Sequence, residues 1–180
     1  MKAIKPLLFL LTVFVLASCG SNSMLGEKVK EPFTGSKYES NSRFFRGTGK
    51  GVSVKDNIAR SKADLEAKNQ LAAQVSTTMK NVTDQYLGQT EDANAADVAD
   101  KFQSLTRQVM NTGLADLRKI GEEKYSDGTN YTVFVAYEIN KNAMFRFMKK
   151  QAKTDSKIDK VTLKAMEDIL DGQIAETEED

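Results

Sequence analysis

The stretch of sequence that decides the fold is RFFRGTGKGV, residues 43–52. Its glycines, Gly47, Gly49 and Gly51, occupy every second position, so in a strand all three lie on one face. A strand face without side chains allows a helix to pack unusually close to it. We therefore expect residues 43–52 to form a strand whose glycine face is covered by a helix.

The segment that follows predicts this helix, over residues 54–87. Apolar residues recur in it every four and every seven positions, and we interpret both series as one apolar stripe whose alanines face the glycine strand. The series of four is Ala59, Ala63, Ala67, Leu71, Val75 and Met79, and the series of seven is Ile58, Leu65, Ala72, Met79 and Tyr86. Ser53 with Asp56 resembles a capping box, and Gly88 is expected to end the helix.

A second helix and a hairpin come next. Apolar residues spaced three and four apart predict a helix over 94–112, ended by Gly113. Asp127-Gly128 is a strong turn signal between strands over 114–125 and 129–139. The second of these strands is apolar on both faces, which is typical of a central or doubly covered strand.

The N-terminus indicates an exported protein. Lys2 and Lys5 precede an apolar run over residues 7–16, which suits a signal peptide and is about half the length of a bilayer-spanning helix. Leu16-Ala17-Ser18-Cys19 fits a lipobox, and here the chain resembles a bacterial lipoprotein precursor. The resemblance implies signal cleavage recognised through Leu16, Ala17 and Ser18, and lipid attached to Cys19. The alternatives are a transmembrane anchor and an ordinary signal peptide with a chance cysteine.

The predicted fold class is α+β: a small three-stranded sheet packed by a long Ala-rich helix and by further C-terminal helices. Of the last two helices, one begins at Asn140 or Lys141 and the other is capped by Asp155 or Ser156. The predicted organisation is a signal peptide over 1–18, a lipidated Cys with a flexible tether over 19–42, a single domain over 43–174 and an acidic tail over 175–180.

The composition excludes several chemistries. The 180 residues include no His and one Cys, which rules out a Ser-His-Asp triad, a His-ligated metal centre, an intramolecular disulfide and an iron–sulfur cluster. Lys+Arg 26 stand against Asp+Glu 25, a balance that favours neither a nucleic-acid binder nor a polyanion. We therefore expect no enzymatic activity, no metal, no cofactor and no nucleic-acid partner.

Lys149, Lys150 and Lys153 are the candidate contact with an anionic surface. They belong to a basic segment over 141–164, and a second basic segment covers 43–62. If the two segments share a face, each basic residue near anionic headgroups would contribute about 1 kcal/mol. The alternative is a solvated helix face that the acidic C-terminal residues balance.

Two further patterns each have a structural and a functional interpretation. The glycine-rich stretch 47–51 before a helix invites a phosphate-binding loop, but it fits neither the dinucleotide nor the Walker A spacing, so close packing is favoured. Four phenylalanines could form a carbohydrate or partner patch, but a place in the core is favoured. They are Phe44, Phe45, Phe145 and Phe147.

The order of these features resembles the Lpp-twenty family of bacterial outer-membrane lipoproteins, and the related N-terminal domain of a flagellar accessory protein. The resemblance covers about residues 44–139. It is carried by the three glycines, the series from Ala59 to Leu71 and the strand over 131–139. It implies a compact α+β domain with a long helix across a small sheet, and it carries over no catalytic residue. The helix over 94–112 departs from the family pattern, which leaves the sheet order open.

Together these features predict a non-enzymatic, lipid-anchored cell-envelope lipoprotein that acts as an accessory or structural protein through protein–protein contacts. Its partners would be the membrane, through Cys19, and other envelope proteins. Gly20, rather than an Asp, follows the cysteine. By analogy with lipoprotein sorting we expect the outer membrane, facing the periplasm, with surface exposure as the alternative. The alternative function is a ligand-binding lipoprotein for a glycan, a lipid or a peptidoglycan fragment.

Overall fold

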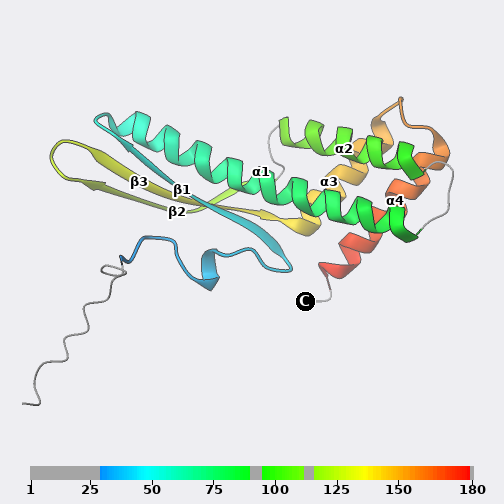
Figure 1. Ribbon diagram of the computed structural model, residues 1–180, viewed down its shortest axis with the longest axis horizontal. Helices are drawn as coiled ribbons and strands as arrows, with labels where there is room; N and C mark the ends of the chain where they lie inside the picture. Colours follow the sequence, from blue (N-terminus) through cyan, green and yellow to red (C-terminus); the bar gives the residue numbers. More distant parts are fainter. Residues whose placement is uncertain (1–28, 90–94, 112–115, 179–180) are drawn as a thin grey trace, which may run out of the picture. The chain divides into compact units, whose positions relative to one another are not determined.

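The computed structural model describes residues 29–89, 95–111 and 116–178. The chain divides into two units, Met1–Lys30 and Glu31–Asp180, and the second unit is the α+β domain that the sequence predicts (Figure 1). In chain order its described elements are η1 Ser36–Tyr38, β1 Phe44–Ser53, α1 Asp56–Gln89, α2 Ala95–Asn111, β2 Arg118–Ser126, β3 Tyr131–Asn140, α3 Lys141–Thr154 and α4 Lys160–Glu176.

The sheet is antiparallel throughout, with the order β1-β3-β2. The strand that is apolar on both faces, β3, is the central one, as its pattern predicts. Val133 and Val135 are buried on the face toward α1, and Ala136 is buried on the outer face. The predicted turn at Asp127-Gly128 joins β2 to β3, with Gly128 in the left-handed region at φ 88°.

The glycine face of β1 lies directly under α1, as expected. A Cβ atom on Gly49 would lie 2.1 Å from the Ala63 carbonyl oxygen, and one on Gly51 would lie 1.9 Å from the Ala59 oxygen. The two spacings match, because four helical residues rise about 6.0 Å and two strand residues about 6.6 Å. Each glycine therefore meets the next alanine, and the stretch serves close packing rather than a phosphate loop.

A row of side chains on α1 bonds the outer edge of β1. The helical residues in this row are spaced four apart, and the strand backbone groups that they meet are spaced two apart. These are the same spacings as those of the alanines and the glycines. Lys62 Nζ donates to the Val52 oxygen (3.1 Å), Lys50 N donates to Glu66 Oε2 (2.8 Å), Thr48 N donates to Gln70 Oε1 (3.2 Å) and Gln74 Nε2 donates to the Arg46 oxygen (2.8 Å). These bonds occupy the backbone groups that another strand would need in order to pair with β1.

A second row on the other side of α1 pairs with β2. Asp56 lies 2.8 Å from Lys124, Arg60 lies 3.1 Å from Glu122, and Asp64 lies 3.7 Å from Lys119. Tyr137 on β3 donates its hydroxyl to Asp64 Oδ1 at 2.7 Å. Burial, followed by this hydrogen bond to a carboxylate, raises the pKa of Tyr137. The long helix is thus held to all three strands.

Residues 31–42 contact the sheet, although the sequence predicts them as tether. The Phe33 ring covers Gly121, where a Cβ would lie 2.4 Å from Phe33 Cε1. Glu31 pairs with Lys50 at 2.7 Å, and Arg46 N donates to Ser40 Oγ at 2.8 Å. The compact unit begins at Glu31, and a few specific contacts hold residues 31–42, which show no apolar periodicity.

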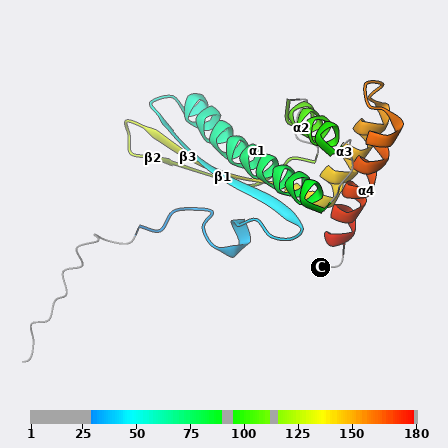
Figure 2. The same cartoon turned by 45° about the vertical axis from the view of Figure 1, so that its right-hand side comes forward.

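Helices α2, α3 and α4 gather about the C-terminal half of α1 (Figure 2). Their buried side chains share one core with the sheet; the largest are Phe102, Phe145, Met144, Met148, Met166 and Leu170. Phe45 is also buried, and Phe147 packs against this core, so both follow the core interpretation.

Several details differ from the sequence expectations. Ile58 and Leu65 are exposed, so the series of seven does not share the stripe of the series of four. A step of seven residues falls 20° short of two full helical turns, so each residue of that series points 20° away from the one before it. The buried row is instead the one that lies along the glycine strand. Gly88 lies inside α1, which continues to Gln89, and Gly113 falls outside the described residues.

The start and end of α4 also differ from those predicted. Asp159, not Asp155 or Ser156, caps it: Asp159 Oδ1 accepts from Val161 N at 2.9 Å and from Thr162 N at 3.1 Å. The acidic tail predicted over 175–180 begins inside α4, which runs to Glu176.

Candidate functional site

A groove of the described residues lies between α1 and α2. Its volume is about 420 Å³. The buried side chains of Met79, Thr83, Phe102 and Thr106 form its floor, and the half-exposed Leu87 lies at one side. Both threonine hydroxyls donate to the carbonyl oxygen four residues earlier, so they present their methyl groups without leaving a polar atom unbonded. We call this surface the α1–α2 groove.

Four charged residues line the rim of the α1–α2 groove: Lys80 and Asp84 on α1, and Asp100 and Arg107 on α2. Within the described part of the chain none of them has an ion-pair or hydrogen-bond partner. Because α2 runs back along α1 (Figure 1), the basic pair lies toward one end of the groove and the acidic pair toward the other. The rim therefore presents opposite charges at the two ends of an apolar floor.

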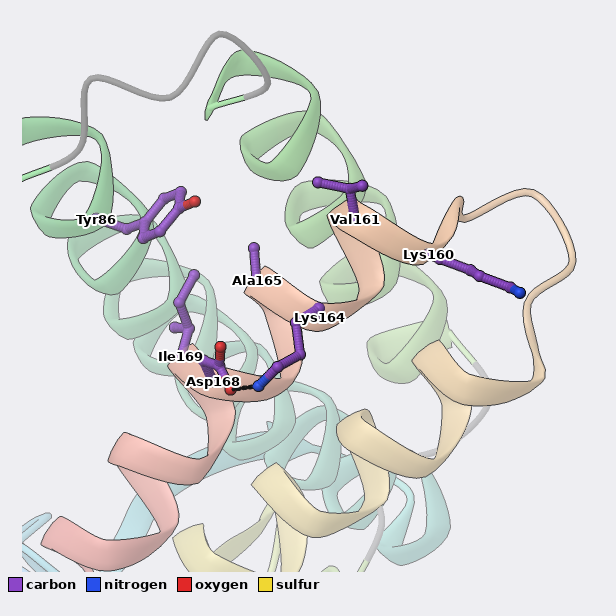
Figure 3. A pocket seen from close by; sticks show the side chains of 7 residues that line it. All are labelled: Tyr86, Lys160, Val161, Lys164, Ala165, Asp168 and Ile169. Carbon is purple, nitrogen blue, oxygen red and sulfur yellow. Dashed lines mark hydrogen bonds and ion pairs between the residues drawn. The ribbon is translucent and has the colours of Figure 1, made fainter.

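A second hollow, of about 620 Å³ and shallower, lies between the end of α1 and α4 (Figure 3). Tyr86 reaches into it from α1, and Ala165 and Ile169 line it from α4. Lys164 and Asp168 at its margin pair with each other at 2.5 Å. Lys160 also lines the hollow and has no ion-pair partner among the described residues, so the hollow offers an apolar contact with one unpaired positive charge at its margin.

The predicted anionic-surface contact lies on α3, where α4 supplies counter-charges. Lys149 lies 2.7 Å from Asp171, and Lys153 lies 2.8 Å from Glu167, whereas Lys150 has no ion-pair partner among the described residues. The hydrogen bond from Lys149 lowers the pKa of Asp171, which keeps the pair charged. Two of the three lysines thus pair with carboxylates of α4.

Sequence reasoning missed the four rim charges of the α1–α2 groove. Each occupies an ordinary polar position of an amphipathic helix, and only the pairing of the two helices brings them around one hollow. The residues Leu16, Ala17, Ser18 and Cys19 lie outside the described residues.

Across residues 29–89, 95–111 and 116–178 no three His, Cys, Asp or Glu side chains lie close enough to hold a metal ion. None of the described helices is long and apolar enough to span a bilayer. No protein-family model matches the chain, and no curated protein matches it at a significant level.

Proposed function

We propose that this chain is a lipid-anchored lipoprotein of a bacterial cell envelope that acts, without catalysis, as an accessory or structural protein through protein–protein contacts. Its resemblance to the Lpp-twenty family, and a place in the outer membrane facing the periplasm, belong to the same proposal. The lipobox Leu16-Ala17-Ser18-Cys19 supports the anchor. The single observation that supports the protein contact is the α1–α2 groove.

The groove suits a segment of another protein better than a small ligand. It is partly open to solvent, and its floor carries one aromatic ring, Phe102, whereas small-molecule sites enclose most of the ligand. An occupant with an apolar centre would place an acidic group near Lys80 and Arg107 and a basic group near Asp84 and Asp100. Such paired charges set the orientation of a partner and the rate of its association.

The test is photo-crosslinking in cells from two neighbouring positions of α2. A crosslinker at Gln103 lies in the groove, and one at Ser104 is exposed outside it. We expect one discrete crosslinked species from Gln103 and none from Ser104. The double variant Lys80→Glu and Arg107→Glu should abolish that species, because it reverses the charge at one end of the groove.

Equal, diffuse crosslinking from both positions would contradict a groove contact. The alternative function, binding of a glycan, a lipid or a peptidoglycan fragment, would be favoured if Gln103 crosslinked to material that is not protein. In either case the fraction of protein that remains with the membrane tests the anchor separately.

A further inference from the structure

Exposed apolar side chains gather at one end of the domain, where β1 turns into α1 and β2 turns into β3. Val52 and Tyr125 lie on either side of Thr132 in the sheet register, so they share its outer face. Val54, in the turn, is 63 % exposed, and Ile58 in the first turns of α1 is 40 % exposed. We call Val52, Val54, Ile58 and Tyr125 the hairpin-end patch; the β1–α1 and β2–β3 turns are at the left of Figure 1.

The chain enters the domain beside this patch. The segment that covers the outer face runs antiparallel to β1, since Glu31 pairs with Lys50 whereas Ser40 bonds Arg46, nearer the start of the strand. Glu31, the first residue of the second unit, therefore lies beside the C-terminal half of β1. Lys50 is two residues from Val52, which is about 6.6 Å along the strand.

The length of the remaining tether restricts what can lie near the lipid. Residues 20–30 separate Cys19 from Glu31, and a chain of this length spans at most about 40 Å when fully extended. Lys50 pairs with Phe134, and the distance along β3 from Phe134 to the end of the strand at Asn140 is about 20 Å. The lysines of α3 lie beyond that point. The hairpin-end patch is therefore nearer than the lysines Lys149, Lys150 and Lys153 to Glu31, the first residue of the domain.

We propose that the hairpin-end patch rests on the surface of the lipid bilayer that holds the anchor, and so fixes the orientation of the domain on the membrane. This inference rests on the proposed lipid anchor at Cys19. Valine and isoleucine side chains favour the acyl boundary, and tyrosine, with an apolar ring and a polar hydroxyl, favours the membrane interface. Lys55 beside Val54 can extend its ammonium group toward the headgroups.

The contact is apolar rather than electrostatic. Glu123 and Asp127 lie at the same end of the sheet as Lys55, so this end carries no strong excess of positive charge. The orientation should therefore hold on neutral lipid and at high salt. In it, the α1–α2 groove, which lies toward the other end of α1, would face away from the membrane.

The experiment compares two valines with nearly the same exposure. Val54 is 63 % exposed and Val161, on α4, is 58 % exposed. The full-length lipoprotein, with either Val54→Cys or Val161→Cys, is labelled with an environment-sensitive fluorophore and reconstituted in phosphatidylcholine vesicles that contain a nitroxide-labelled lipid. Acylated Cys19 has no free thiol, so only the introduced cysteine reacts.

We expect the label at position 54 to shift its emission to the blue and to lose fluorescence to the nitroxide lipid, while the label at position 161 does neither. Protein that floats with the vesicles but shows the same aqueous emission at both positions would overturn the membrane-facing patch and leave the anchor standing. Protein that does not float with vesicles would overturn the proposed anchor, and this inference with it. Matching circular dichroism spectra establish that both variants are folded.

Discussion

Three glycines on β1 determine how near α1 can approach the sheet. At Gly49 any side chain would meet helix backbone, because the nearest atoms to a Cβ are the Ala63 oxygen and the Ala67 nitrogen, at 2.1 and 2.6 Å. Backbone cannot move aside as the end of a flexible side chain can. The alanines opposite are equally constrained, since Ala59, Ala63 and Ala67 are all fully buried.

Substituting one glycine at the α1 contact and one elsewhere separates the effect of packing on stability from the effect of helix propensity. Gly49→Ala should destabilise the domain by about 3 kcal/mol or more, the upper end for overpacking, because the helix must lift from the strand. Gly172→Ala, inside α4 with no atom within 4 Å of its Cβ, should stabilise by about 1 kcal/mol through helix propensity. Urea unfolding of both variants measures these changes in the free energy of unfolding. Wild-type stability in Gly49→Ala would mean that α1 does not sit on β1.

The same residues show why the fold class could be predicted. A two-residue glycine period followed by a four-residue alanine period specifies a strand and a helix whose steps match. Phe33 gave no such signal, because its contact with Gly121 joins distant parts of the chain through a single ring. Its φ of 57°, unusual for a residue with a side chain, shows how closely the contact constrains this segment.

At the scale of elements, α1 makes different contacts with the two edges of the sheet. Toward β1 it directs side chains that bond the strand backbone, while toward β2 it directs charged groups that pair with side chains. The backbone of β1 is thereby covered. The edge of β2 carries exposed charges and an irregularity between Lys119 and Gly121, two features that discourage pairing with a further strand.

Removing one bond from the β1 edge should weaken the sheet measurably. Glu66→Ala deprives Lys50 N of its acceptor and should cost roughly 1 kcal/mol, because water can replace the carboxylate at an exposed edge. The matched control is Asn69→Ala, on the same helix, where no hydrogen bond to the sheet is lost. Thermal unfolding should show a lower midpoint for Glu66→Ala alone. Identical midpoints would refute a contribution of this row to stability.

Element boundaries were predicted less well than the elements themselves. Asp155, Ser156 and Asp159 are all plausible helix caps in sequence, and the choice among them depends on where α4 must start in order to bury Thr162 and Met166. The end of α1 could not be assigned from the glycine at position 88 either, because there is open space around Gly88 and α1 continues through it.

At the scale of the whole molecule, contacts with the sheet begin at Glu31, inside the stretch that composition predicts as tether. Residues 31–42 occupy part of the outer face of the sheet, and the helical end and the hairpin-end patch remain available to partners. The α1–α2 groove could not be predicted, because its four rim charges come together only when two helices pair. The lipobox, in contrast, is local in sequence and needs no tertiary structure to be recognised.

The measurement that tests the account most directly is the intact mass of the mature protein purified from bacterial membranes, beside the variant Cys19→Ala. The proposal predicts an N-terminus at Cys19 with the added mass of a lipid modification, and a variant that is neither processed at this site nor held in the outer membrane. A wild-type protein with an unmodified Cys19, or with its N-terminus at another residue, would contradict it.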